Sequence, residues 1–295
     1  MILCFDIGGS RIKAAVSRGG VVQPLGHAPT PLQDFAGFAA VLAGFQRGLM
    51  SGGEALRGVA ISIAGVVDPA SGRIKVANIP GLDGRVVGQD LEAALGVPVL
   101  VLNDADCFAL AEARQGAGRG QRNVFGIILG TGVGGGLVID GRLVSGPGGY
   151  AGEWGHGPVI RDPAFACGCG QVGCVDTVGG ARGLERLHLH LHRAVASSVD
   201  ILAGWQAGGT EAAATVALWL DLVSGPLAMV VNVVGPSVVP VGGGLANVPA
   251  LIAALDLAVR ARILRPTDRP LLVAAGCLVE PGLVGAAEAG ELAFG

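Results

Sequence analysis

The sequence contains few charged and few aromatic side chains for its length. Of its 295 residues only 15% are charged and 4% are aromatic, whereas 51% are hydrophobic. Because globular proteins average about 25% charged residues, this composition excludes disorder and indicates that much of the chain is buried. The length suits two modest domains or one large one.

Basic charge is also scarce. Twenty Lys and Arg residues are dispersed along the chain against 23 Asp and Glu, which gives a net charge of -3. We therefore expect no nucleic acid partner. Residues 1–20 lack a basic segment followed by an apolar one, so they do not read as a secretory signal, and we expect a cytoplasmic protein.

One stretch imitates a membrane span. No charged residue lies between Asp221 and Asp256, which exceeds the ~20 residues that a membrane-crossing helix needs. Pro226, Pro236 and the glycines after Val241 would interrupt such a helix repeatedly. We expect instead a helix, a buried strand over residues 237–241, a glycine turn and a second helix, with no membrane partner.

Strand-like and helix-like patterns alternate along the chain. Residues 1–6 and 12–16 predict a hairpin, residues 58–64 and 97–102 predict strands, and helical periodicity covers residues 34–50, 90–95 and 107–114. Strands over residues 124–129 and 136–139 flank a second glycine loop. The order predicts an α/β protein whose two halves each open on a glycine-rich hairpin.

Three glycine-rich turns could approach a ligand closely. Residues 6–13 read Asp-Ile-Gly-Gly-Ser-Arg-Ile-Lys, residues 130–136 form a glycine loop that contains Thr131, and residues 241–244 read Val-Gly-Gly-Gly. Backbone N–H groups in the first two turns can cradle a phosphate chain, and a flat ring could lie on the bare backbone of the third. Taken alone, each of the first two is equally consistent with an ordinary turn, but two such hairpins in one chain favour a phosphate site.

A polar cluster follows the apolar strand that ends at Leu102. Asn103, Asp104 and Asp106 stand where a strand ends and a helix starts, and ligands commonly bind there in open α/β sheets. A carboxylate opposite a phosphate site can act as general base for an attacking hydroxyl. Either aspartate could instead be only the cap of the helix.

His156, Cys167, Cys169 and Cys174 have the spacing of a metal site. Four such ligands in one compact loop suit tetrahedral Zn²⁺. The other three cysteines, Cys4, Cys107 and Cys277, stand in apolar surroundings and read as core residues. A second histidine group, His188, His190 and His192, has only its first and last members on one helical face, which favours a solvated surface over a metal site.

These motifs together resemble the ROK family of sugar kinases, within the actin-like and hexokinase-like ATPase fold, over nearly the whole chain. The motif residues are Asp6 to Lys13, Asn103-Asp104, the glycine loop at 130–136, Glu153-Trp154-Gly155-His156, and Cys167 to Asp176. Ser10 replaces the usual Thr, and Asp176 replaces the commoner Glu. Several short segments of the sequence look closest to those of bacterial N-acetylglucosamine kinases.

The resemblance implies ATP-dependent phosphorylation of a hexose 6-hydroxyl in a cleft between two domains. It gives Asp104 the role of general base and assigns sugar binding to Gly65, Asn78, Asn103, Glu153, His156 and Asp176. His156 would use one ring nitrogen on a structural zinc ion and offer the other to the sugar. We expect a small domain over residues 1–108, a large domain over 109–280, and a helix at about 281–295 that packs back onto the small domain.

ATP and Mg²⁺ would bind through the glycine turns. In this resemblance Asp6 organises Mg²⁺ through water, and Gly243 and Gly244 lie near the adenosine. The residues around the phosphates are Gly8, Gly9, Ser10, Lys13, Thr131 and Gly132.

The alternatives use the same residues. A glucokinase or an N-acetylmannosamine kinase would differ only in the sugar, and the family also suggests a homodimer. Related transcriptional repressors carry a helix-turn-helix domain ahead of the first phosphate motif, for which the position of Asp6 leaves no room. A non-catalytic sugar-binding sensor is opposed by the presence of Asp6, Asp104 and both phosphate loops.

Overall fold

The structure is a computed structural model that describes residues 1–50, 53–275 and 278–295, so the predicted core residue Cys277 lies outside the described residues. Its contacts divide the chain into two compact units. The first comprises Met1–Gly116, Arg142–Ala151 and Leu278–Gly295, and the second comprises Ala117–Gly141 and Gly152–Cys277. Residues 109–116, 142–151 and 278–280 thus belong to the first unit, although the predicted large domain over residues 109–280 included them.

The first unit is built on a mixed five-stranded sheet in the order β3-β2-β1-β4-β7. Its strands are β1 (Ile2–Ile7), β2 (Arg11–Arg18), β3 (Val21–Pro29), β4 (Gly58–Ile63) and β7 (Val99–Asn103). The predicted hairpin is confirmed, since β1 pairs antiparallel with β2, whereas β4 runs parallel to both β1 and β7. Short elements complete the unit: β5 (Val66–Val67), β6 (Ile74–Lys75), β10 (Arg142–Val144) and the 3-10 turns at Pro80–Leu82 and Pro147–Gly149.

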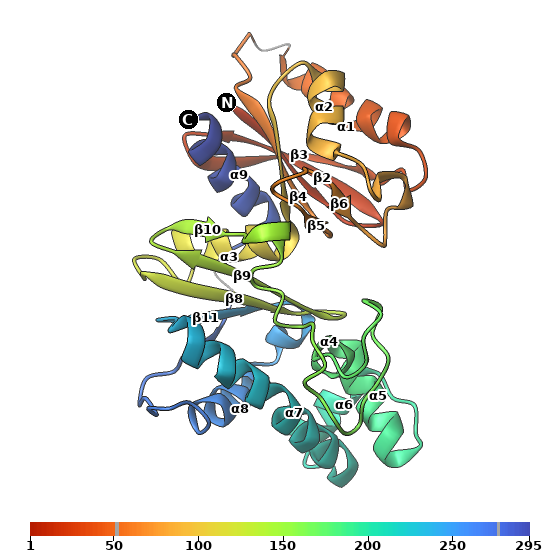
Figure 1. Ribbon diagram of the computed structural model, residues 1–295, viewed down its shortest axis with the longest axis vertical. Coiled ribbons are helices and arrows are strands. Elements are labelled where there is room, and N and C mark those ends of the chain that lie inside the picture. Colours follow the sequence, from red (N-terminus) through yellow and green to blue (C-terminus); the bar gives the residue numbers. More distant parts are fainter. Residues whose placement is uncertain (51–52, 276–277) are drawn as a thin grey trace. The chain divides into compact units, whose positions relative to one another are not determined.

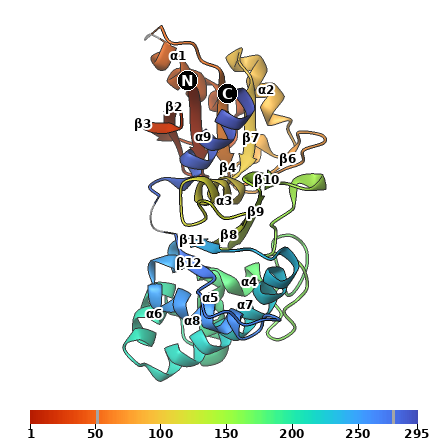
Figure 2. The ribbon, with the colours of Figure 1, turned by 90° about the vertical axis from the view of Figure 1, so that its left-hand side faces the viewer.

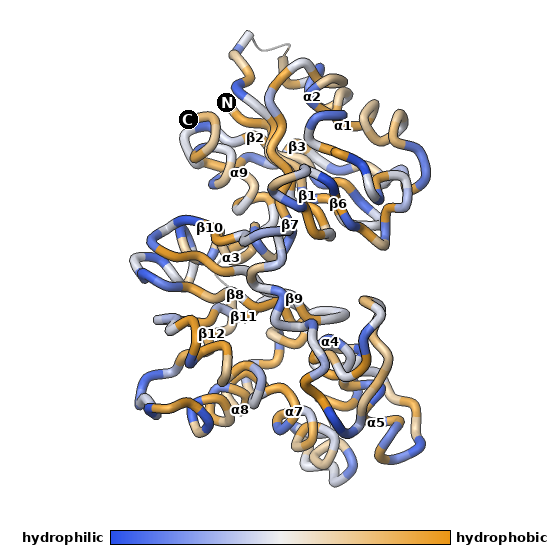
Figure 3. The backbone as a smooth tube through the Cα atoms, in the orientation of Figure 1, coloured by the Kyte–Doolittle hydropathy of each residue, from blue (hydrophilic) through white to orange (hydrophobic). Residues whose placement is uncertain are grey.

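Strand alternation places different side chains on the two faces of this sheet. One face, which includes Phe5 and Ile61, packs with Phe38 and Leu42 of α1 (Phe35–Met50) and with Leu91 of α2 (Val87–Leu95). The other face carries smaller side chains, among them Cys4, Ala15 and Ala60, and it is covered by α9 (Pro281–Phe294) and α3 (Asp104–Arg114). Figures 1 and 2 show α9 lying along these strands, which Figure 3 colours mainly as hydrophobic.

The second unit contains a sheet in which β9, β8, β11 and β12 are neighbours. These strands are β8 (Asn123–Leu129), β9 (Val133–Ile139), β11 (Val239–Gly242) and β12 (Leu272–Ala274). Helices α4 (Asp176–Gly179), α5 (Ala181–His192), α6 (Ser198–Gln206), α7 (Thr210–Val234) and α8 (Pro249–Arg260) and the 3-10 turn Gly244–Asn247 complete it. The core joins apolar side chains of the strands to Trp219 and Val223 of α7.

Helix α3 begins earlier than predicted. It starts at Asp104 rather than Cys107, and its N-cap is Asn103, whose side chain accepts hydrogen bonds from the backbone N–H groups of Ala105 and Asp106. The interpretation of an aspartate as the cap is therefore wrong. Both aspartates lie in the first helical turn, where negative charge is favoured by the helix dipole.

The predicted order of helix, buried strand, glycine turn and helix after Asp221 is confirmed, but Pro226 does not end the helix. Helix α7 continues through it over 25 residues. By length and composition α7 is the one helix among the described residues that could cross a membrane, and 44% of its most apolar window is buried within the protein. Burial of Trp219, Val223 and Leu227 explains this apolar character as core packing.

The prediction of a solvated histidine surface is wrong for His188. Its side chain is buried, and Nδ1 lies 2.9 Å from the hydroxyl oxygen of Thr215 on α7. The rings of His188 and His192 are in contact, with centroids 4.8 Å apart. Packing of α5 against α7 therefore withdraws this face from water, which the spacing along α5 alone did not reveal.

Candidate functional site

A polar row crosses three adjacent strands of the first unit. Asp6 on β1 is the register partner of Lys13 on β2 and of Ser62 on β4, so the three side chains share one face of the sheet. The Ser62 hydroxyl donates to Asp6 Oδ1 at 3.0 Å, and Lys13 Nζ lies 3.7 Å from Asp6 Oδ2. Burial raises the pKa of Asp6, while the Ser62 hydrogen bond and the Lys13 charge oppose the rise.

The start of α9 packs against Asp6 and Lys13. Glu280 forms an ion pair with Lys13, and a Cβ on Gly282 would lie 2.5 Å from Asp6 Oδ1, so only glycine lets the helix approach so closely. Glu280 adopts a left-handed backbone with φ 55°, which is uncommon for a residue with a side chain. The predicted magnesium carboxylate Asp6 is thus flanked by side chains of two neighbouring strands and by the start of α9.

The glycine turn after Asp6 has its backbone shaped by hydrogen bonds. The N–H of Gly8 donates to the carbonyl of Arg11 at 3.0 Å, and the Thr30 hydroxyl donates to the carbonyl of Gly8 at 2.7 Å. A Cβ on Gly9 would lie 3.4 Å from the Asn78 side chain. Asn78, predicted to bind sugar, therefore stands beside the predicted phosphate turn, in which Ser10 is exposed.

Parallel pairing brings the predicted catalytic residue to the same edge. Ile7, Ile63 and Asn103 are register partners at the carboxyl ends of β1, β4 and β7, so the glycine turn, Gly65 and Asp104 all follow aligned strand ends. The Asn103 amide donates to the carbonyl of Gly65 at 2.9 Å, and its oxygen caps α3. Asn103 therefore shapes this edge as well as being available for the sugar role predicted from the sequence.

The second unit gathers the other predicted glycine turns. A Cβ on Gly243, which has φ 88°, would lie 2.6 Å from the nitrogen of Gly130, so the turn after β11 touches the turn after β8. The carbonyls of Gly130 and Thr131 accept from the N–H groups of Ala181 and Arg182. Thr131, Gly132, Gly243 and Gly244 consequently share one end of the second sheet, as a nucleotide site across two strand ends requires.

Asp176 connects this turn to the predicted sugar loop. Its Oδ1 accepts from the N–H of Val133 at 2.8 Å, and a Cβ on Gly132 would lie 2.4 Å from that oxygen. Its own N–H donates to the carbonyl of Gly155 at 2.8 Å. One carboxylate oxygen of Asp176 is thus committed to the glycine turn.

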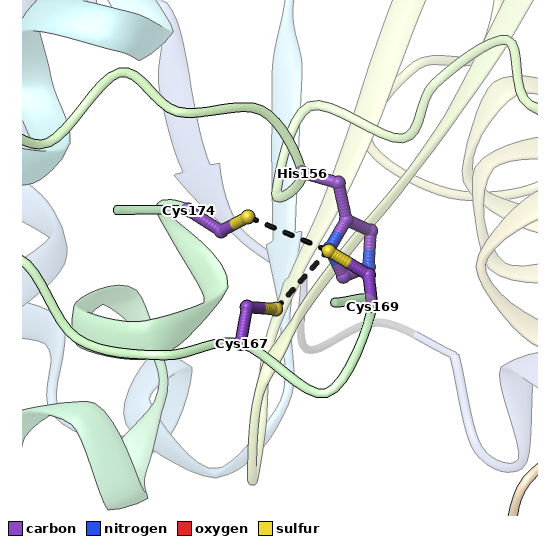
Figure 4. Close-up of side chains that lie close together, drawn as sticks. All are labelled: His156, Cys167, Cys169 and Cys174. Atoms are coloured by element: carbon purple, nitrogen blue, oxygen red, sulfur yellow. Dashed lines mark hydrogen bonds between the residues drawn. The ribbon is translucent and has the colours of Figure 1, made fainter. Parts of the chain in front are cut away.

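Four side chains of the second unit converge as a metal site would require. The ligand atoms of His156, Cys167, Cys169 and Cys174 all lie within 4.8 Å of one another, and Figure 4 shows the side chains pointing together. The sulfurs of Cys169 and Cys174 are 3.6 Å apart, and Cys167 Sγ is 3.7 Å from His156 Nδ1. Zn–S bonds of about 2.3 Å in a tetrahedron separate donors by roughly 3.7 Å, so these residues fit Zn²⁺.

His156 presents its two ring nitrogens in different directions. Nδ1 faces the thiols, and Nε2 lies 3.9 Å from a carboxylate oxygen of Glu153. Burial raises the pKa of Glu153, and the neighbouring Asp176 adds to the rise while His156 opposes it. Glu153, His156 and Asp176, all predicted to bind sugar, are therefore brought together beside the cysteines.

Two residues beside Asp6, Ser62 and Glu280, were not predicted from the sequence. Ser62 is a polar residue in an otherwise apolar strand, which was a usable signal, since a hydroxyl in a buried strand needs a partner. Glu280 precedes Pro281 and Gly282 at the start of a helix, and no motif distinguished it. The predicted core cysteines Cys4 and Cys107 are confirmed as buried.

The chain is similar to known proteins over nearly its whole length. The model of the ROK family matches residues 2–289. An N-acetyl-D-glucosamine kinase from Pasteurella multocida (strain Pm70) is 34% identical over 294 residues, covering 96% of this chain and 97% of that protein. An N-acetylgalactosamine kinase from Shewanella sp. (strain ANA-3) is 36% identical over 296 residues, covering 97% of this chain and 95% of that protein.

Solved structures agree with the fold. A ROK hexokinase from Thermus thermophilus superimposes with a TM-score of 0.88 at 32% identity and covers 99% of this chain and 98% of its own. A ROK family glucokinase from Streptomyces griseus, solved with glucose and AMPPNP, has a TM-score of 0.76 at 28% identity, with 98% of each chain covered. The expected actin-like and hexokinase-like α/β fold is confirmed.

Proposed function

Since this chain belongs to the ROK family, we propose that it is an ATP-dependent kinase that phosphorylates the 6-hydroxyl of a hexose, with N-acetylglucosamine as its preferred substrate. The observation that carries the proposal is the alignment of Ile7, Ile63 and Asn103. It puts the glycine turn after Asp6 and the carboxylate of Asp104 at one edge of the first sheet. Phosphoryl transfer needs a phosphate-binding turn and a carboxylate that accepts the hydroxyl proton.

Each proposed role follows from a group in the structure. Asp104, in the first turn of α3, takes the proton of the 6-hydroxyl as that oxygen attacks the terminal phosphorus of ATP. Asp6 would hold Mg²⁺ through water, and the bound cation would supply charge neutralisation at the phosphates. The phosphates lie against Gly8, Gly9, Ser10, Lys13, Thr131 and Gly132, and the adenosine lies near Gly243 and Gly244.

We assign sugar binding to Gly65, Asn78, Asn103, Glu153, His156 and Asp176, and zinc to His156, Cys167, Cys169 and Cys174. Zinc at Nδ1 of His156 would leave Nε2 protonated, as a donor to a sugar oxygen. Bound there, zinc would supply structural support only, because its four ligands would tie down the loop that carries Glu153 and Asp176. Support comes from the distances among the four ligand atoms and from the hydrogen bond of Asp176 to Val133.

The choice of sugar is tested by steady-state kinetics with ATP and a panel of hexoses. The panel compares N-acetylglucosamine with N-acetylgalactosamine, N-acetylmannosamine and glucose, because relatives named for the first two share about a third of their residues with this chain. A fitted acetamido contact is worth ~1–3 kcal/mol, so glucose should be disfavoured by roughly 10- to 200-fold in kcat/KM. A higher kcat/KM for glucose would overturn the sugar assignment and leave the kinase assignment standing. Absence of ATP consumption with every sugar would overturn both.

We also propose a cytoplasmic homodimer. Met229 and Val233 stand one turn apart on α7 and are 63% and 78% exposed, and Leu257 on the neighbouring α8 is 61% exposed. Exposed apolar side chains on adjacent helices suit a subunit interface. None of the five described cysteines is paired in a disulfide. Light scattering should give twice the chain mass for the wild type and a smaller mass for Val233→Asp.

A further inference from the structure

The ion pair between Lys13 and Glu280 lies beside the proposed magnesium carboxylate, and Glu280 has no role in the mechanism above. The Lys13 ammonium stands between two acids, paired with Glu280 Oε2 and 3.7 Å from Asp6 Oδ2. With both acids ionised, these three side chains carry a net charge of -1. The Lys13 ammonium is thus shared between Asp6, whose carboxylate is proposed to meet the metal, and Glu280, whose carboxylate is not.

Geometry decides which acid holds the ammonium more closely. Glu280 makes the direct hydrogen bond with Nζ, whereas Asp6 is engaged by the Ser62 hydroxyl through Oδ1. Asp6 and Lys13 are directly opposed on neighbouring antiparallel strands, so a small rotation of the lysine would pair them directly. Glu280 is held at its position by the start of α9, in a backbone conformation that is uncommon for a residue with a side chain.

We propose that Glu280 is a positioning residue for the divalent cation: by holding Lys13, it keeps the ammonium from closing on Asp6, so that the Asp6 carboxylate stays available to Mg²⁺. Without Glu280, Lys13 pairs with Asp6 and competes with the cation. This inference rests on the proposed function, because it takes Asp6 as the carboxylate that meets Mg²⁺.

The test measures cation binding separately from turnover. Mn²⁺ is titrated into the protein with saturating AMPPNP and no sugar, and free Mn²⁺ is read by electron paramagnetic resonance. Glu280→Gln keeps the shape of the side chain and removes its charge, and it should weaken Mn²⁺ binding by about 3- to 5-fold, the scale of a partly exposed ion pair. Lys13 is also a proposed phosphate contact, so the AMPPNP concentration is first shown to be saturating for the double variant Lys13→Met/Glu280→Gln. With AMPPNP bound, this variant should recover the Mn²⁺ affinity lost in Glu280→Gln, because the competing ammonium is gone.

The matched control is Glu291→Gln on the same helix. Glu291 pairs with Arg57 and accepts from the Ser17 hydroxyl, away from Asp6, so this variant loosens α9 without freeing Lys13. It should bind Mn²⁺ as the wild type does. Unchanged Mn²⁺ affinity in Glu280→Gln, or no restoration in the double variant, would overturn the inference.

These outcomes are distinct from a failure of the proposed function. A wild-type protein that binds no Mn²⁺ with AMPPNP, or that phosphorylates no sugar, refutes the kinase proposal before any variant is compared. Thermal unfolding of each variant shows whether it is folded at the temperature of the titration. A Glu280→Gln protein that is folded, binds AMPPNP and loses Mn²⁺ affinity supports the positioning role alone.

Discussion

Gly282→Ala should separate activity from stability in one substitution. A methyl group at this position would lie 2.5 Å from Asp6 Oδ1 and 2.7 Å from Asp6 Cγ. Ordinary contacts need about 3.5 Å, so the carboxylate or the start of α9 must move by about 1 Å. A displacement of that size at a reacting centre lowers turnover by about a hundredfold. Meanwhile alanine gains up to about 1 kcal/mol of helix propensity over glycine, which offsets part of the strain.

The assay compares kcat at saturating ATP and sugar with the midpoint of thermal unfolding. We expect kcat to fall by about two orders of magnitude while the midpoint changes little. Gly44→Ala is the matched control, because it lies in α1 of the same unit and no atom stands within 4 Å of the added methyl group. It should keep its activity and gain some stability. A folded Gly282→Ala protein with wild-type kcat would refute the role of Asp6 or the close approach of α9.

Four further predictions concern individual residues and the metal site. Asp104→Asn keeps the helix start and should lower kcat by about a hundredfold or more, with sugar affinity retained in a calorimetric titration; near-normal turnover would refute the general base. Asn103→Ala removes the cap of α3 and should cost about 1–2 kcal/mol in urea unfolding, and an unchanged midpoint would show that the cap is dispensable. Purified protein should contain about one zinc per chain, and chelation should abolish sugar binding; a metal-free, active protein would refute the zinc site. In the zinc-free protein a hydrogen bond from the Gln171 N–H lowers the pKa of Cys169 to about 7, whereas burial raises the pKa of Cys167 to about 12. Because the thiolate is the reactive form, iodoacetamide should label Cys169 before Cys167, at a rate that rises as the pH passes 7.

Local signals in the sequence were sufficient for much of the fold. The β1–β2 hairpin and helix α1 follow from apolar periodicity within a few residues, and the structure confirms both. The spacing of His156 and the three cysteines is equally local, since all four lie within nineteen residues of one loop. Side-chain chemistry and chain geometry over such short distances leave few alternatives.

Contacts between distant segments were decided only in three dimensions. Ser62 meets Asp6 across 56 positions and Glu280 meets Lys13 across 267, because parallel pairing of β1 with β4 and docking of α9 bring them together. Helix packing likewise buries His188 against Thr215, although its spacing along the chain suits a solvated face. The sequence by itself supplied the residues proposed for phosphate and zinc, because glycine turns and ligand spacing are local features, and its family resemblance supplied those proposed for the sugar. The charges that surround Asp6 depend on which strands and helices become neighbours, and only the tertiary structure decides that.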